Sequence, residues 1–105
     1  MSYTVEFTDQ ARADFRGIYE YIAFTLQSKI NADRQYARIE QEIKSLSEMP
    51  ERYKALDLDL GKTVRIVAVD NYCVLYYVLK ETNVVQILRI LYGGRDIETE
   101  MKNGN

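Results

Sequence analysis

Three arginines and one tyrosine in the second half of the chain have the side chains best suited to chemistry. They are Arg65, Arg89, Tyr92 and Arg95. The sequence contains no histidine, so it lacks the commonest general base and the commonest metal ligand. It also contains no zinc, nucleotide-loop or nucleophile–histidine motif. Any reaction would therefore depend on these cationic and phenolic groups, and no metal or cofactor is expected.

Two of the arginines, Arg65 and Arg89, lie in otherwise apolar runs, where an unpaired charge would be costly. One interpretation is structural: each guanidinium reaches the rim of a sheet or pairs with a carboxylate such as Asp70 or Asp96. The other interpretation is that each contacts a phosphate or a macromolecular target. Arg95 follows two glycines, which let the backbone turn sharply and present a side chain. Its structural alternative is a surface ion pair with Asp96 or Glu98.

Composition narrows the class of protein. The 105 residues include 14 basic and 16 acidic side chains, a net charge of −2. A strong general nucleic-acid binder would usually be basic, so this balance argues against that class. The single cysteine excludes an intrachain disulfide and suits a reducing compartment. With no apolar stretch of membrane-spanning length and no signal-like segment, a soluble, cytoplasmic protein without membrane contact is expected.

Two helices are predicted in the first half of the chain. Residues 3–7 alternate as a short strand does, and Thr8 followed by Asp9 is a good helix start. Two amphipathic stripes follow, and the second stops at Pro50. The stripe positions are Ala11, Phe15, Ile18, Ile22 and Leu26, then Ala32, Tyr36, Ile39, Ile43 and Leu46. A short polar loop between them predicts an antiparallel helical hairpin.

The second half predicts strands. Residues 63–69, 72–79 and 84–92 are apolar, β-branched and aromatic runs separated by turn residues, which indicates an antiparallel meander. Residues 51–62 could be a loop or an irregular strand. We therefore predict an α+β fold in which an N-terminal strand and the meander form a small sheet, with the helical hairpin packed on one face. A single domain over 1–105 is expected, ending in a flexible tail.

That tail is expected over residues 98–105. The three strands are apolar on both faces, whereas an antiparallel sheet with one face in water normally alternates. The hairpin can cover one face, so the other is a candidate partner surface. Register decides which set of side chains points outward. The two candidate sets are Cys73, Leu75, Tyr77 and Leu79, or Tyr72, Val74, Tyr76 and Val78.

This order of segments, and the residues within them, resemble the RelE/ParE superfamily, the toxin half of bacterial type II toxin–antitoxin (plasmid stabilisation) modules. The resemblance extends over residues 3–97. It is carried by Val64-Arg65-Ile66, Asn71-Tyr72 with Tyr76-Tyr77, and Leu88-Arg89-Ile90 through Arg95-Asp96. It implies a cytoplasmic, growth-inhibiting toxin that acts on DNA gyrase or on mRNA in the ribosome.

The resemblance also implies a cognate antitoxin that wraps over the toxin and alone contacts operator DNA. The surplus apolar surface of the predicted sheet fits such a partner. The residues expected to bind the antitoxin are Tyr72, Leu75, Tyr77 and Leu79.

Several positions depart from the ribosome-dependent nucleases of this superfamily. In those enzymes a positive group stabilises charge on the scissile phosphate, and a tyrosine, histidine or carboxylate moves the proton of the 2′-hydroxyl. Cys73 stands where those nucleases commonly have an arginine, and Met101 stands where they commonly have a tyrosine. Arg95 matches their last arginine, and Tyr92 lies where relatives often carry histidine.

Three functions therefore remain open. The first is inhibition of gyrase by binding, which fits the low charge and the missing arginine and tyrosine. The second is ribosome-dependent mRNA cleavage, with Arg65 and Arg95 holding phosphate, Arg89 available to the same set, and Tyr92 assisting proton transfer. The third is an inactive module that holds its antitoxin on operator DNA.

Overall fold

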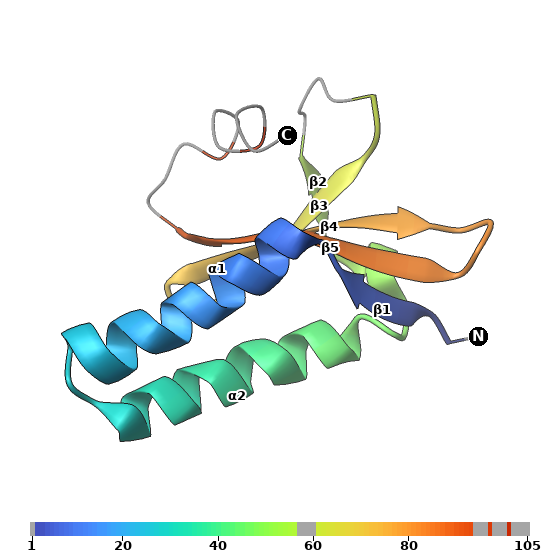
Figure 1. The fold of residues 1–105 in the computed structure, drawn as a ribbon. Coiled ribbons are helices and arrows are strands. Elements are labelled where there is room, and N and C mark those ends of the chain that lie inside the picture. Colours follow the sequence, from blue (N-terminus) through green and yellow to red (C-terminus); the bar gives the residue numbers. More distant parts are fainter. Residues whose placement is uncertain (1, 57–60, 94–96, 98–100, 102–105) are drawn as a thin grey trace.

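The computed structural model describes residues 2–56, 61–93, 97 and 101. Its elements are β1 (Thr4–Phe7), α1 (Asp9–Glu20), a π-helical turn (Tyr21–Thr25), α2 (Lys29–Ser45), a 3₁₀ turn (Pro50–Arg52), β2 (Lys54–Leu56), β3 (Val64–Val69), β4 (Tyr72–Leu79) and β5 (Val84–Tyr92). The predicted α+β fold, with a helical hairpin beside a sheet, is confirmed (Figure 1).

The described strands form one sheet in the order β1-β5-β4-β3-β2. The predicted antiparallel meander of β3, β4 and β5 is present, and β1 pairs with β5 in parallel. The ambiguous segment 51–62 contains the short strand β2, which pairs antiparallel with β3. Residues 57–60 of that segment lie outside the described part of the chain.

Capping residues set the start of both helices. The hydroxyl of Thr8 accepts a hydrogen bond from the Ala11 N–H at 3.1 Å, as predicted for a helix N-cap. The hydroxyl of Ser28 caps α2 by accepting from the Asn31 N–H. Between the helices, α1 passes into the π-helical turn, which shifts the helical phase. The sequence stripe placed Leu26 on the buried face, but past this turn its side chain is 55% exposed.

Strand β5 is longer than β1, which pairs with one of its edges. Beyond the end of β1, helix α1 lies along that edge of β5. Only Val84–Ile87 of β5 pairs with β1. Beyond that point, the Thr8 hydroxyl donates to the Leu88 carbonyl at 3.0 Å, and the Asp14 carboxylate accepts from the Ile90 N–H at 2.9 Å. In Figure 1 the chain bends where β1 ends, and α1 runs beside this part of the sheet.

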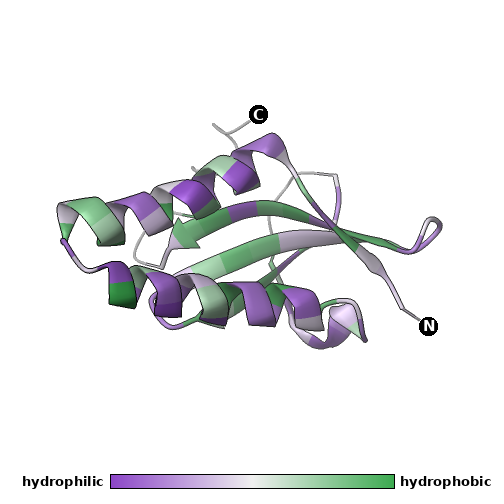
Figure 2. Ribbon diagram, turned by 60° about the horizontal axis from the view of Figure 1, so that its bottom comes forward, coloured by the Kyte–Doolittle hydropathy of each residue, from purple (hydrophilic) through white to green (hydrophobic). Residues whose placement is uncertain are grey.

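The main core lies between the hairpin and the sheet. It joins residues of both helices to one face of the central strands: Ala11, Phe15, Ile39, Ile43, Leu46, Val67, Val69, Val74, Tyr76, Val85, Ile87 and Ile90. Figure 2 shows the strands largely hydrophobic and the helices richer in hydrophilic residues. Tyr76 is fully buried, and its hydroxyl donates to the Pro50 carbonyl at 2.6 Å. Burial raises the pKa of Tyr76 to about 12.

A second apolar cluster covers the opposite face of the sheet. It contains Val64, Leu75, Leu88, Leu91 and Met101, with Leu56, Cys73, Tyr77 and Ile97 packed against it. The register question is thereby answered: the Tyr72 set faces the helices and the Cys73 set faces away from them. A bulge in the pairing of β4 with β5 lies at Leu75 and Tyr76. Of the predicted tail 98–105, only Met101 is described, and it is buried.

Candidate functional site

Arg89 is held by a helix. Its Nε and Nη2 atoms donate to the two oxygens of Asp14 on α1 at 2.7 and 3.0 Å. Both side chains are largely buried, with 15% and 16% of their surfaces exposed. The same carboxylate accepts from the Ile90 N–H, so it satisfies an unpaired edge of β5 as well as a charge. The sequence suggested Asp70 or Asp96 as the partner, and the carboxylate found here is Asp14.

Arg65 is held by a loop. Its Nη1 donates to the carbonyls of Glu51 and Tyr53 at 3.2 and 2.8 Å. Its Nη2 lies 3.7 Å from the carboxylate of Glu51, which also pairs with Lys80 at 3.1 Å. The guanidinium therefore fixes the turn that precedes β2, on the helix side of the sheet. Asp70, which the sequence suggested as a partner for Arg65, forms an ion pair with another arginine.

The Asp70 carboxylate joins α2 to the turn between β3 and β4. It accepts from Arg38 at 2.7 and 2.9 Å and from Gln35 at 3.1 Å. These two donors, Arg38 foremost, hold the pKa of Asp70 below its usual range. A backbone φ of +55° at Asp70 forms the tight turn that the Asp70-Asn71 pair predicted.

Among the predicted catalytic residues that the structure describes, the two arginines lie apart. Arg65 lies on β3 against the 3₁₀ turn, whereas Arg89 lies on β5 against α1. Tyr92 ends β5 and is 54% exposed, with its ring packed edge-on against Tyr72 at 5.6 Å between centroids. Arg95 lies outside the described residues.

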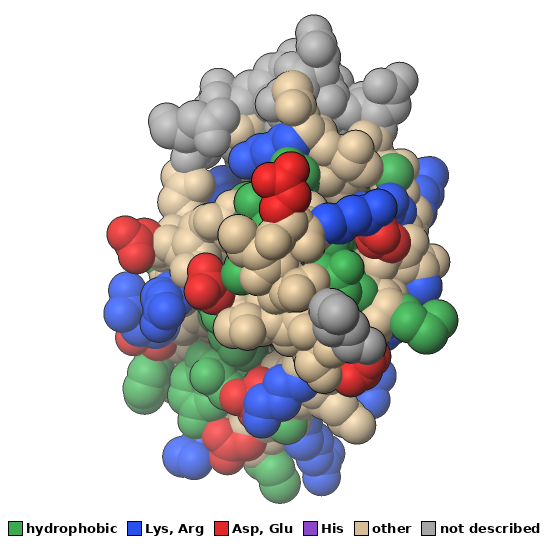
Figure 3. Space-filling view, turned by 90° about the vertical axis from the view of Figure 1, so that its right-hand side faces the viewer, with side chains coloured by type: hydrophobic (Ala, Val, Ile, Leu, Met, Phe, Trp, Pro, Cys, Tyr) green, Lys and Arg blue, Asp and Glu red, His purple; other side chains and the backbone are tan. Residues whose placement is uncertain are grey.

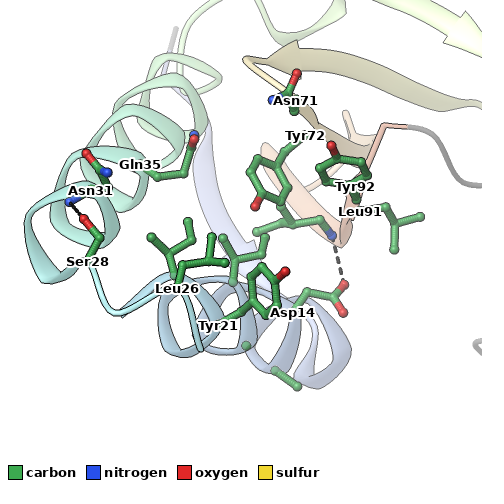
Figure 4. A pocket seen from close by; sticks show the side chains of 15 residues that line it. Asp14, Tyr21, Leu26, Ser28, Asn31, Gln35, Asn71, Tyr72, Leu91 and Tyr92 are labelled. Carbon is green, nitrogen blue, oxygen red and sulfur yellow. Dashed lines mark hydrogen bonds between the residues drawn. The ribbon is translucent and has the colours of Figure 1, made fainter. Parts of the chain in front are cut away.

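Tyr72 and Tyr92 line a groove of about 920 Å³ between the sheet and the end of the helical hairpin. Figure 4 shows both rings on one side of this groove, facing Tyr21 and Leu26 of the hairpin. Burial, together with the neighbouring phenols of Tyr92 and Tyr21, raises the pKa of Tyr72. The Tyr72 phenol therefore stays protonated at neutral pH and is a poor proton acceptor.

The walls of the groove are apolar and amide-bearing. Its polar lining comes from Asp14, Ser28, Asn31, Gln35 and Asn71, and Asp14 is already paired with Arg89. Interface cores are typically rich in aromatic residues and poor in charged ones. This composition suits contact with a protein better than contact with a polyphosphate.

Exposed apolar side chains concentrate beside the groove, at the tip of the hairpin. Tyr21, Phe24, Leu26 and Ile30 are 52%, 72%, 55% and 61% exposed. We call these four residues the hairpin tip. Sequence reasoning missed it because the predicted stripe placed Leu26 on the buried face, and the π-helical turn, which contains Tyr21 and Phe24, has no clear sequence signal. Ile30 lies on α2, off the predicted stripe.

Sequence reasoning also missed Lys62. Its ammonium lies over the Tyr77 ring at 5.4 Å from the centroid, on the side of the sheet away from the helices. Gln86 is the cross-strand neighbour of Tyr77. Lys62 belongs to the segment 51–62, for which the sequence left a loop and an irregular strand equally open, so no pattern predicted this contact.

The residues predicted to bind a partner divide between two places. Leu75, Tyr77 and Leu79 lie on the face away from the helices, where Leu75 is fully buried and the other two are partly exposed. Tyr72 lines the groove instead. Cys73 is partly buried, and burial raises the pKa of its thiol, as expected for an unreactive side chain.

The described residues were also compared with the requirements of a metal site and of a membrane-spanning helix. Within them, no group of three or more His, Cys, Asp or Glu side chains is placed to hold a metal ion. No helix in the same part of the chain is long and apolar enough to span a membrane. On the face shown in Figure 3, basic and acidic side chains are interspersed and form no continuous basic surface.

A helical hairpin against one face of a small sheet, with an edge strand parallel to the last strand, defines the RelE/ParE class of toxin. The model of the ParE toxin family of type II toxin–antitoxin systems (parDE) matches residues 5–97. The chain therefore belongs to the ParE toxin family. No curated protein matches its sequence.

Solved structures share this fold. A chain of the chromosomal ParDE toxin–antitoxin system from P. aeruginosa superposes with a TM-score of 0.72 at 20% identity, covering 87% of this chain and 96% of the other. A chain of the RelBE2 toxin–antitoxin complex from Mycobacterium tuberculosis gives 0.65 at 27% identity, covering 88% and 92%. The intact RelBE complex from E. coli gives 0.61 at 17% identity, covering 90% and 100%.

Proposed function

We propose that this ParE-family toxin arrests growth in the cytoplasm by binding DNA gyrase, without catalysis, and that a cognate antitoxin neutralises it. One observation carries the preference for binding over RNA cleavage. Arg65 and Arg89, two of the cations expected to hold phosphate, are both committed to protein partners. Releasing either one would leave a partly buried carboxylate or carbonyl without its donor.

The remaining departures support the same preference. Cys73 and Met101 stand where the nucleases of the superfamily commonly have an arginine and a tyrosine, and Met101 is buried in the second apolar cluster. A net charge of −2 is also unfavourable for docking onto RNA, because affinity for nucleic acid comes largely from neutralising phosphates.

The groove and the hairpin tip are the surface that we assign to the target. Aromatic anchors in a charge-poor setting carry most of the energy of typical protein interfaces. Tyr92, Tyr21 and Phe24 supply such anchors here.

The antitoxin is assigned to the other side of the sheet. The solved relatives come from toxin–antitoxin systems or complexes, which supports a cognate antitoxin for this chain. Tyr77 and Leu79 are partly exposed there, and Leu75, on the same face of β4, is fully buried. Tyr72 would take part only where an antitoxin segment reaches the groove. Operator DNA would be contacted through the antitoxin.

One observation favours ribosome-dependent mRNA cleavage as a second candidate function. Lys62 and Tyr77 place a cation and a phenol side by side on the face away from the helices. In this alternative, Lys62 would stabilise charge on a phosphate, with Arg95 and Tyr92 as the remaining sequence-based candidates.

Induction of the chain in bacteria, followed by primer extension on translated mRNA, separates these functions. We expect growth arrest without cuts at ribosomal A sites, and recovery when a cognate antitoxin is co-expressed. Cuts at A sites would favour the nuclease. Normal growth with soluble, folded protein would favour an inactive module that only holds its antitoxin.

A further inference from the structure

Three tyrosines line the groove beside the hairpin tip. Tyr72 and Tyr92 come from β4 and β5, and Tyr21 comes from the π-helical turn. Figure 4 shows the Tyr21 ring on the hairpin side of the groove, opposite the two strand tyrosines. Tyr21 and Tyr92 are 52% and 54% exposed, so a group that enters the groove from solvent can reach their rings.

The two strand tyrosines form an aromatic corner. Tyr72 and Tyr92 are cross-strand neighbours, with ring centroids 5.6 Å apart and ring planes at 85°. Two rings nearly at right angles each present part of a face to the space between them. The face of an aromatic ring carries partial negative charge, so this corner attracts a cation that comes within about 6 Å of the ring centroids.

The charges near this corner do not oppose an incoming cation. The described lining of the groove contains no lysine or arginine. Its carboxylate, Asp14, is paired with Arg89. Asp70, which accepts from the lining residue Gln35, is paired with Arg38. The two ion pairs therefore leave the ring faces as the main electrostatic feature of the described lining, and that feature favours positive charge.

The polar side chains of the lining suit a cation with several N–H donors. Ser28, Asn31, Gln35 and Asn71 bring hydroxyl and amide oxygens to the groove. The Nε2 of Gln35 is engaged with Asp70 at 3.1 Å, which leaves its Oε1 as an acceptor. A guanidinium has five donors in one plane, stacks on aromatic faces and is more weakly hydrated than an ammonium. An arginine side chain therefore fits these walls better than a lysine.

We propose that this groove binds an arginine side chain of the toxin's target, with the guanidinium in the corner between Tyr72 and Tyr92. Its N–H groups would donate to the amide oxygens of the lining, and its methylene stem would lie against the apolar side chains of Leu26 and Leu91. Arginine is among the residues that contribute most to protein interfaces. The inference rests on the proposed function for the identity of the partner, but not for the chemistry of the site.

Capped tripeptides test the site on the isotope-labelled full chain. The probe is alanine–arginine–alanine, and its matched control carries citrulline, which has nearly the same shape but no charge. Amide shifts of Asn71, Tyr72 and Tyr92 report binding. At equal ionic strength, we expect the arginine peptide to bind about fivefold more tightly than the citrulline peptide, because two ring faces each add a modest cation–π attraction. Equal affinity of the two peptides, tighter binding of a leucine or lysine tripeptide, or no shift at tens of millimolar peptide would overturn the inference.

Substitutions of Tyr92 separate the effect of the ring from that of an apolar contact. Tyr92→Phe keeps the ring face and should keep the preference for arginine over citrulline, whereas Tyr92→Leu should reduce it to about twofold or less. Both variants should fold, because Tyr92 is 54% exposed, and their amide spectra verify this. Tyr19→Leu, which changes a partly buried tyrosine outside the lining of this groove, should keep the full preference. An unchanged preference in Tyr92→Leu, or an equal loss in Tyr92→Phe, would contradict a role for the ring.

The same variants connect the site to the target. If gyrase supplies the arginine, Tyr92→Leu should inhibit supercoiling more weakly than Tyr92→Phe. Equal inhibition by the two variants would overturn the assignment of the arginine to the target. The tripeptide experiments contain no gyrase, so a preference for arginine in a chain that leaves supercoiling unchanged would support the site and reject the proposed function. Inhibition of gyrase by a chain without that preference would overturn this inference alone.

Discussion

Arg89 on β5 and Asp14 on α1 form a two-pronged ion pair between residues 75 positions apart in sequence. The pair joins the start of the helical hairpin to the part of β5 that β1 leaves uncovered. Because Asp14 also accepts from the Ile90 N–H, one carboxylate is the hydrogen-bond acceptor for both the Arg89 guanidinium and a backbone N–H at the edge of β5. The arginine that the sequence offered as a catalytic group therefore connects two layers of the fold.

Asp14→Asn should lower the free energy of unfolding by about 2–3 kcal/mol, since it removes one partner of a largely buried, hydrogen-bonded charge pair. Urea denaturation followed by circular dichroism measures this change. Glu81→Gln, at an exposed turn, should stay within about 0.5 kcal/mol of the unchanged protein. Equal stability of Asp14→Asn and the unchanged protein would show that the pair contributes nothing.

Tyr76 should make stability fall at alkaline pH. Its pKa in the folded chain is about 12, against an ordinary value of 10.0 for tyrosine, so the folded state holds this proton more tightly than the unfolded state. The resulting stability is fully present below pH 10 and is lost as the pH rises towards 12. The loss should be on the order of 2 kcal/mol. Urea midpoints across this range measure it.

Tyr76→Phe is the matching test. It should remove that part of the alkaline loss, while lowering stability at pH 7 by about 1–2 kcal/mol because the Pro50 carbonyl loses its donor. Tyr3→Phe should retain the full alkaline loss. If the free energy of unfolding falls equally with alkaline pH in Tyr76→Phe and Tyr3→Phe, the alkaline loss does not come from Tyr76.

Phe24→Asp should abolish growth arrest without unfolding the protein, because it places a charge in the surface assigned to the target. A loss of affinity for the target of tenfold or more is expected for a central anchor, on the order of 2 kcal/mol. Met49→Asp is a closely matched control, since both side chains are 72% exposed and Met49 lies outside the hairpin tip. Growth counts after induction give the result. Continued arrest by Phe24→Asp would place the target surface elsewhere.

Arg65→Met distinguishes a structural arginine from a catalytic one. It should lower stability by about 1–2 kcal/mol, because the Glu51 and Tyr53 carbonyls lose a charged donor. Growth arrest should nevertheless persist at a temperature where the variant is folded. A nuclease that uses Arg65 to stabilise transition-state charge would instead lose roughly a hundredfold in activity or more.

Local patterns predicted the elements well, because caps and apolar spacing act over a few residues. Thr8 begins α1 as expected, and the three C-terminal runs become β3, β4 and β5. The register of β4 could not be predicted in the same way. Tyr76 and Leu75 are both fully buried on opposite faces, so no polar alternation distinguishes the two sides.

The partners of the arginines were also beyond sequence reasoning. Burial in an apolar strand predicts that a charge needs a partner, but it does not say which carboxylate the fold brings near. Asp14 reaches Arg89 because α1 replaces β1 along β5, and that geometry follows from the short length of β1. The exposed hairpin tip was missed for a related reason, because the π-helical turn at Tyr21–Thr25 changes the helical phase.

A supercoiling assay with purified chain and DNA gyrase tests the central claim most directly. Relaxed plasmid, ATP and gyrase are incubated with increasing amounts of the chain, with Phe24→Asp and Met49→Asp assayed in parallel. We predict that the unchanged chain and Met49→Asp inhibit supercoiling, and that Phe24→Asp does not. Unchanged supercoiling at a large molar excess of the folded chain would contradict gyrase binding as its mode of action.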